Sequence, residues 1–289
     1  MNMDTLSEKL TRLYETHWDD FTAQLKAANL KERLQDPLLL SLALSGQQKS
    51  EREEDQKKAG YDTWHARKST ANHEDWYTKA DVKIMFFGQE TNGWARGCDV
   101  GELTAAYEDF LDDHYNADEG HFYTEGLQRG NRFMRWGING IMSGVREMLE
   151  PYPGKRVAMI WNEISKLSAR KGEGGTSVDA AAHEIERRYF HVIPKEVEIL
   201  RPDILVFLTG PGENTYYNYI KENFTVGVPQ QLGSLPLHDV AKLPIEGVKL
   251  AYKTYHPGAR GTTEEFHWQF YQAILDDIKI HLDTLLQGK

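Results

Sequence analysis

The stretch that decides the fold is residues 83–94 (KIMFFGQETNGW), where an apolar run passes directly into polar residues. Three later segments repeat this arrangement: residues 157–167 (VAMIWNEISKL), 204–212 (ILVFLTGPG) and 249–260 (KLAYKTYHPGAR). Short apolar runs that end in glycine or polar residues are typical of buried strands in a parallel sheet. Open α/β sheets bind ligands at the carboxyl ends of such strands, so the polar residues there are candidates for a functional site.

Amphipathic helices are expected around these strands. Apolar side chains recur at helical spacing over residues 4–30, and residues 38–45 predict a second helix after Pro37. Further helices are predicted within residues 95–130 and over residues 131–149, 180–189 and 214–222. The last helix is expected to begin with Thr262, which stands three residues before Glu265 in a capping box. The segment 225–248 reads as a loop with small strands.

These elements predict a single α/β domain over residues 1–289, a length sufficient for one large core. The expected architecture has three layers, α/β/α, with a four-stranded, mostly parallel central sheet over residues 80–280. Residues 1–60 are expected to form an N-terminal helical extension. The chain shows no internal repeat or low-complexity linker.

Composition sets limits on the class of protein. Hydrophobic residues are 40% and charged residues 27%, which is ordinary for a globular protein. The longest apolar run is too short to span a bilayer, and the N-terminus lacks the apolar core of a signal peptide, so we expect a cytoplasmic protein without membrane contact. A single cysteine, Cys98, excludes an internal disulfide and cysteine-pair metal sites. We expect no metal, no cofactor and a monomer.

The net charge of −10 counts against a protein that wraps extended DNA, because proteins that neutralise many phosphates are usually basic. A small basic groove on one face remains compatible with this charge.

The polar residues at the predicted strand ends are Gln89, Glu90, Asn92, Asn162 and His256. They supply a carboxyl acid or base, amides that can hydrogen-bond the edge of a flat ring, and an imidazole. Simpler roles stay open from the residues alone. Glu90 could start a helix, Asn162 could close a turn, and His256 could be a satisfied buried histidine.

Three of these segments together resemble the uracil-DNA glycosylase superfamily. Its first strand ends in a Gly-Gln-Asp-Pro-Tyr-His type motif, its second in an apolar run closed by Asn, and its fourth in a His-Pro-Ser type motif. This chain shows GQETNG at 88–93, MIWN at 159–162 and YHPGAR at 255–260, in the same order. The resemblance covers residues 80–280. It implies the superfamily's fold and hydrolysis of the N-glycosidic bond of a base flipped out of DNA.

The resemblance also implies roles for single residues. Glu90 stands at the position of the superfamily's Asp and would stabilise the sugar cation or activate water. Asn162 would pair with the Watson–Crick edge of a flipped pyrimidine, and His256 would hold the departing base. The remaining residues of the base pocket would be Gln89, Asn92 and Trp94.

Contacts with the DNA strand are expected in two loops. Lys166, Arg170 and Lys171 follow the second strand and would bind phosphates, although a solvated loop is the simpler reading. Gly258 and Arg260 follow the fourth strand, where the superfamily's apolar wedge is missing, so Arg260 would fill the gap left by the flipped base.

The departures from the superfamily pattern concern the base. The Pro-Tyr-His continuation is replaced by Thr91, Asn92 and Gly93. In uracil-specific enzymes that Tyr closes the pocket at C5 of the base, and Asn92 is much smaller. The sequence therefore predicts a pocket for a pyrimidine that can carry a 5-substituent, as in modified phage DNA, which suggests an antiviral role.

Two other functions stay open. A non-catalytic nucleic-acid or nucleotide binder on the same fold is favoured by the acidic charge and the altered first motif. A hydrolase of free nucleosides or other small N-glycosides is the third candidate, because it needs no basic groove.

Overall fold

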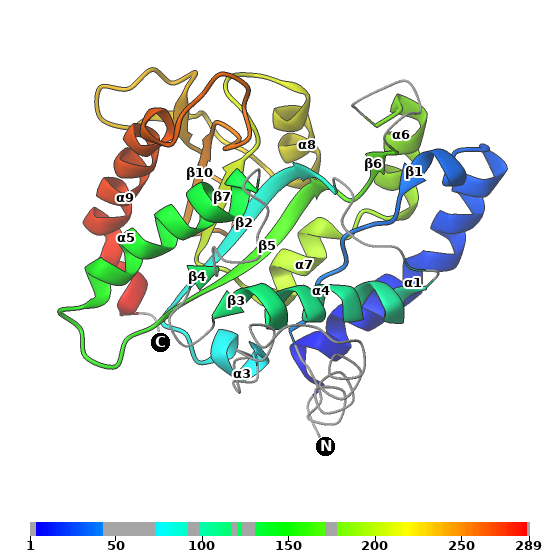
Figure 1. Cartoon of the computed structure of the whole chain (residues 1–289), viewed down its shortest axis with the longest axis horizontal. Helices are drawn as coiled ribbons and strands as arrows, with labels where there is room; N and C mark the ends of the chain where they lie inside the picture. The colour runs from blue at the N-terminus through cyan, green and yellow to red at the C-terminus, as the bar shows by residue number, and fades with distance from the viewer. Residues whose placement is uncertain are drawn as a thin grey trace, which may run out of the picture.

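A computed structural model of the chain describes residues 4–42, 73–91, 97, 99–116, 121–122, 131–170 and 178–287 (Figure 1). It is a mixed α/β fold in which helices cover both faces of a mostly parallel sheet, compatible with three layers. The buried apolar side chains form one continuous cluster that includes the N-terminal helix. Within the described ranges, no helix combines the length and the apolar character needed to cross a membrane.

The central sheet has six strands in the order β5-β2-β7-β10-β9-β8. The four predicted strands are all present and parallel: β2 (Val82–Glu90), β5 (Val157–Ser165), β7 (Ile204–Leu208) and β10 (Leu250–Thr254). The predicted number of strands was wrong, because part of segment 225–248 pairs antiparallel with β10 as β9 (Val240–Lys242) and then β8 (Gln230–Gln231).

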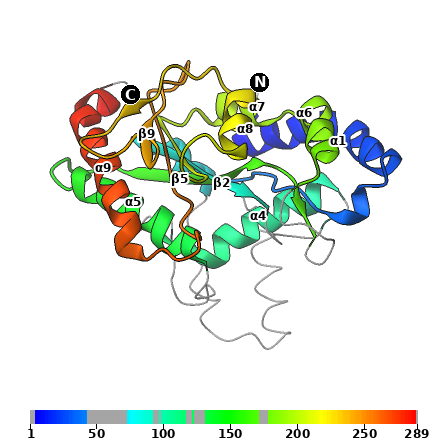
Figure 2. The ribbon, with the colours of Figure 1, turned by 90° about the horizontal axis from the view of Figure 1, so that it is seen from above.

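Helices lie on both sides of this sheet, with α4 and α5 on one face and α7 and α8 on the other (Figure 2). The larger helices are α1 (Leu6–Ala27), α4 (Val100–His114), α5 (Asn139–Leu149), α6 (Ala180–Tyr189), α7 (Ile193–Leu200), α8 (Thr215–Asn223) and α9 (Glu264–Leu286). The smaller elements are η1 (Lys31–Arg33), β1 (Leu34–Gln35), α3 (His73–Thr78), β3 (Tyr115–Asn116), β4 (His121–Phe122), the π-helix Phe133–Ile138 and β6 (Ser168–Ala169).

Local sequence explains why β5 and β7 are strands. Every residue of both is buried, as expected when helices cover both faces of a parallel sheet. Strand β5 lies at the sheet edge, where Tyr107 of α4 covers its backbone. The Tyr107 hydroxyl accepts from the Trp161 N–H at 3.1 Å and donates to the Trp161 carbonyl at 2.7 Å. This contact closes an edge that could otherwise pair with another chain.

Local sequence specifies both the start and the buried face of the N-terminal helix. Thr5 and Glu8 form a capping box at the start of α1, and its buried stripe includes Leu10, Tyr14 and Phe21. The prediction of a helix after Pro37 was wrong for residues 38–42, the part of that segment that the structure describes. Leu38, Leu39 and Leu40 have no exposed surface and lie in non-helical backbone.

Helix α9 begins one residue later than predicted. Its N-cap is Thr263, whose side chain accepts from the Phe266 N–H. The hydroxyl of Thr262 instead contacts the Ala259 carbonyl and the His267 ring, so it holds the preceding loop against the helix.

Candidate functional site

A pocket of about 430 Å³ lies at the carboxyl ends of β2, β7 and β10. Gln89 comes from the end of β2, and the loops that follow β7 and β10 supply the other walls. The lining residues are Gln89, Gly210, Pro211, Asn214, Thr215, Tyr216, His256, Gly258, Ala259 and Arg260. The structure therefore brings together four of the residues that the sequence analysis selected, at the edge of the sheet where ligands of α/β proteins bind.

His256 is held with a defined tautomer. The Gly258 N–H donates to Nδ1 at 3.0 Å, so in the neutral ring the proton is on Nε2. Burial, together with the nearby His267, lowers the pKa of His256 to about 4. The ring of Phe133 stacks on it with centroids 5.6 Å apart. At neutral pH, His256 is therefore an uncharged donor that lines the pocket.

Glu90 lies at the end of β2, beside this pocket. Burial raises the pKa of Glu90 to about 7, and the charge of Glu186 adds to that effect. Hydrogen bonds from the Tyr216 hydroxyl, 3.3 Å from Oε1, and from the Val178 N–H act in the opposite direction. A carboxyl group that titrates near neutral pH can act as a general acid or base.

Tyr216 links Glu90 to the pocket, and the sequence analysis missed it. It lies in the first turn of α8, whose N-cap Asn214 accepts from the Tyr217 N–H at 2.9 Å. Tyr216 lines the pocket and donates its hydroxyl to Glu90. The sequence feature that could have identified Tyr216 was the turn at residues 208–214, which leads from a buried strand directly into a helix.

The loop between β7 and α8 is tightly constrained. Gly210 and Gly212 have φ values of +109° and +59°, a region that favours glycine. The Lys253 Nζ donates to the Gly212 carbonyl at 2.6 Å, and the Gln89 Nε2 donates to the Thr209 carbonyl at 3.0 Å. One wall of the pocket is therefore fixed by β2 and β10.

Asn162 is not at the pocket, which corrects the prediction that it reads a base. Strand β5 continues to Ser165, so Asn162 lies inside the strand with no exposed surface. Its Nδ2 donates to Glu196 Oε2 at 2.8 Å, and its Oδ1 accepts from the Lys166 Nζ at 2.7 Å. Both ends of the amide are already occupied in the interior.

Lys166 is also fully buried, which corrects its prediction as a phosphate contact. Its ammonium group contacts Glu196 Oε1 at 2.7 Å, Asn162 Oδ1 at 2.7 Å and the Leu38 carbonyl at 3.1 Å. Tyr14 of α1 donates to the same Glu196 oxygen at 2.6 Å. We call Tyr14, Asn162, Lys166 and Glu196 the Lys166 cluster. It fastens the N-terminal segment to the core.

Arg170 is partly buried rather than presented to solvent. Its Nε donates to the Leu34 carbonyl at 2.7 Å, and its backbone N–H donates to the Arg33 carbonyl. Strands β1 and β6 pair beside it. The other predicted contacts Asn92, Trp94 and Lys171 lie outside the described residues.

Glu163 is a further titratable residue at this end of the sheet. It is 5% exposed and its Cα pairs with that of Gly88. The Trp161 Nε1 donates to Oε1 at 3.0 Å. Burial raises the pKa of Glu163 well above its ordinary value, despite the opposing effects of that hydrogen bond and of the Lys166 charge. The sequence analysis passed over it because it directly follows Asn162.

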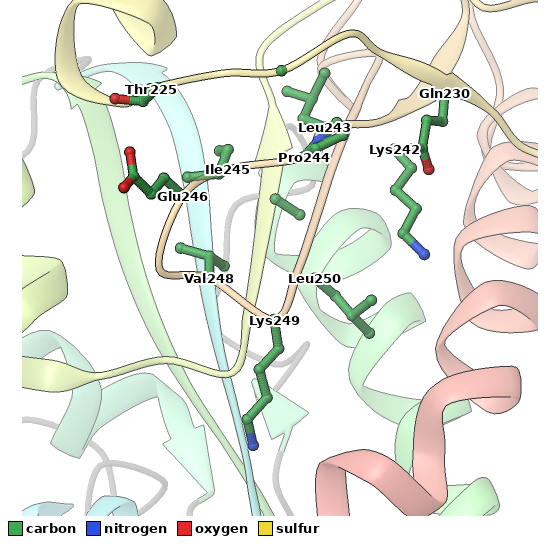
Figure 3. Close-up of a pocket in the computed structure, with 12 residues that line it drawn as sticks. Thr225, Gln230, Lys242, Leu243, Pro244, Ile245, Glu246, Val248, Lys249 and Leu250 are labelled. Carbon is green, nitrogen blue, oxygen red and sulfur yellow. The ribbon is translucent and has the colours of Figure 1, made fainter.

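A second hollow, of about 450 Å³, lies at the opposite end of β10 (Figure 3). Its walls are largely apolar, and it contains none of the predicted site residues. Its two lysines are paired, Lys242 with Asp277 at 2.8 Å and Lys249 with Asp203 at 2.9 Å. We call the pocket at the carboxyl ends of β2, β7 and β10 the strand-end pocket. It is therefore the better candidate for a functional site.

The comparisons with known proteins assign no family. A scan against models of protein families finds no match, and a search of curated proteins also finds none. Among the described residues, no three His, Cys, Asp or Glu side chains gather as a metal site. The chemistry of the pocket therefore provides the evidence for a function.

Proposed function

We propose that the chain is a DNA glycosylase that hydrolyses the N-glycosidic bond of a flipped pyrimidine. The observation that carries this proposal is a neutral imidazole donor, His256, in the wall of the pocket, with a carboxyl of pKa about 7, Glu90, beside it and hydrogen-bonded to the lining residue Tyr216. Departure of a base needs a donor for the negative charge that develops on it and a carboxylate near the sugar.

In this proposal, each residue has a distinct part. The neutral His256 donates a hydrogen bond from Nε2–H to the leaving base, on which negative charge develops. The Glu90 carboxylate stabilises the cationic sugar or takes a proton from the attacking water. Gln89, Gly258 and Arg260 line the same pocket and contact the nucleotide. Asn162, Lys166 and Arg170 are not part of the proposed site, because their polar groups are engaged inside the protein.

The test is a screen of oligonucleotides that carry uracil, mismatched thymine or 5-modified pyrimidines, followed by alkaline cleavage of abasic sites. We expect abasic product from at least one base, lost in Glu90→Gln and His256→Leu proteins that remain folded. Exposed Glu246→Gln is the matched control. Absence of abasic product from every base with the intact protein would contradict the proposal. A defensive role would follow only from a preference for phage-type modified bases.

A non-catalytic nucleotide or nucleic-acid binder is the second candidate. It is favoured by the net charge of −10 and by the described pocket lining, in which Arg260 is the only lysine or arginine. A Glu90→Ala protein that retains full affinity and biological effect would favour this function. Affinity that does not change with salt would indicate a free nucleoside rather than a DNA strand.

A further inference from the structure

The carboxyl group of Glu163 occupies the space directly above Gly88. A Cβ atom at position 88 would lie 2.2 Å from Glu163 Oε2, so any side chain there would force this carboxyl group to move. Glycine at position 88 therefore leaves open the space that the carboxyl group fills. Glu163 does not itself line the pocket, but its partner in the sheet, Gly88, is the neighbour of Gln89, which does.

One oxygen of this carboxyl has no hydrogen-bond partner. Oε1 accepts from the Trp161 Nε1, whereas Oε2 is buried and unpartnered in the part of the chain that the structure describes. Native proteins leave few buried polar atoms in this state, because an unmade hydrogen bond is unfavourable. Glu196 of α7, another buried carboxyl, has partners for both oxygens.

A row of aromatic rings connects Glu163 with the pocket. The Trp161 ring, which holds Oε1, lies 6.1 Å from the ring of Phe133, and Phe133 stacks on His256 at 5.6 Å. Phe133 begins a π-helix, a rare irregularity that is frequent at functional sites. This row of contacts leads from the carboxyl group of Glu163 through two rings to His256 in the pocket wall.

The protonation state of Glu163 determines what it can recognise. Burial raises the pKa of its carboxyl well above the ordinary value, which favours the neutral acid form. Oε1 already serves as an acceptor, so the proton is on Oε2, which becomes a donor in need of an acceptor.

We propose that Glu163 is a specificity-determining residue that donates from Oε2 to a keto oxygen of the flipped base. The inference rests on the proposed function and narrows its substrate class. A uracil-type base, with or without a 5-substituent, presents a keto acceptor at C4. A cytosine-type base presents an amino donor at C4 and is rejected.

The experiment measures binding, so that it does not depend on catalysis. The probes are single-stranded oligonucleotides that contain one 2′-fluoro-2′-deoxyuridine or one 2′-fluoro-2′-deoxycytidine, whose glycosidic bonds resist hydrolysis. We expect the intact chain to bind the uracil probe about tenfold or more tightly than the cytosine probe. Glu163→Gln keeps a donor and should retain this ratio, whereas Glu163→Leu should bring it close to one.

A matched control is Glu108→Gln, which alters another buried carboxyl, contacted by Ser41, and should leave the ratio unchanged. Raising the pH until Glu163 ionises should lower the ratio in the intact chain but not in Glu163→Gln. A ratio near one in the intact chain, or a full ratio in a folded Glu163→Leu protein, overturns the inference.

Abasic-site assays in parallel separate this inference from the proposed function. A Glu163-dependent base preference without cleavage supports the inference while the proposed hydrolysis fails. Cleavage with a preference that ignores residue 163 overturns the inference and leaves the proposed function standing.

Discussion

The Lys166 cluster and the strand-end pocket both lie near the β2–β5 pair, yet they use polar side chains in opposite ways. In the Lys166 cluster, the ammonium group, the amide and the carboxylate all have partners within the protein. In and beside the pocket, Glu90 titrates near neutral pH, His256 presents a protonated Nε2, and Glu163 has an unpartnered oxygen. Buried charges that are fully paired hold the fold together, whereas groups at a strand end that titrate or retain hydrogen-bonding capacity are available to a ligand.

The largest effect is expected from Lys166→Met. It leaves Glu196 as an uncompensated buried charge, so we expect about 3–5 kcal/mol lower free energy of unfolding, measured with urea. The double change Lys166→Met with Glu196→Gln should recover part of this loss. Exposed Lys195→Met should change stability by less than about 0.5 kcal/mol. A Lys166→Met protein with normal stability but reduced DNA affinity would break the comparison, because Lys166 would then belong to the binding surface.

His256→Leu should lower kcat for the preferred base by about 10²–10³-fold, because it removes the donor that meets the charge on the leaving base. The assay is single-turnover release of that base. The free energy of unfolding should change far less than in Lys166→Met. Exposed His191→Leu serves as the control. Equal losses of stability in the His256 and Lys166 variants would place His256 among the structural residues.

Glu90 should make stability depend on pH. Its pKa is about 7 in the folded protein and 4.5 as the ordinary value, so the folded state binds the proton more tightly. The stabilisation is therefore fully present below pH 4.5 and is lost as the pH rises through 7. Glu90→Gln should remove this decline. Between pH 4.5 and pH 8, the free energy of unfolding of the unchanged protein should therefore fall by about 1–2 kcal/mol more than that of Glu90→Gln.

The measurement is urea unfolding at several pH values, with Glu246→Gln as the control that should retain the decline. Identical pH profiles for the Glu90→Gln and unchanged proteins would show that the site does not raise the pKa of Glu90.

The smallest effect is expected from Tyr216→Phe. The Tyr216 hydroxyl lowers the pKa of Glu90, so its removal should raise that pKa further and move the acidic limb of the pH–rate profile to higher pH. With the carboxylate as the active form, the rate at pH 7 should fall by about three- to tenfold. Tyr219→Phe, on the same helix, is the control. A lower rate with an unshifted profile would limit Tyr216 to shaping the pocket.

Part of the candidate site was predictable because strand ends leave a local signal. Gln89, His256, Gly258 and Arg260 follow apolar runs, and the structure places all four around one pocket. The same rule failed for Asn162, since β5 continues for three residues beyond it. Polar residues can continue a buried strand when distant partners satisfy them. For Asn162 that partner is Glu196, which lies 34 residues away in the chain.

The fold was predictable to a similar degree. The four parallel strands and most of the helices follow from apolar spacing, but the run at residues 38–42 is equally compatible with helix or extended backbone. Its backbone is fixed by contacts with other segments, such as the bond from the Leu40 N–H to the Tyr14 hydroxyl at 3.0 Å. The two added strands are short and become strands only by pairing beside β10.

The sequence by itself determined the four parallel strands, most of the helices and the presence of polar residues at the strand ends, because these depend on spacing between near neighbours. Only the tertiary structure decided that Lys166 and Asn162 are internal, that Glu90 titrates near pH 7, that His256 is neutral, and that Glu163 lies over Gly88. Burial, protonation and hydrogen-bond partners are set by residues far apart in the chain, and no local pattern records them.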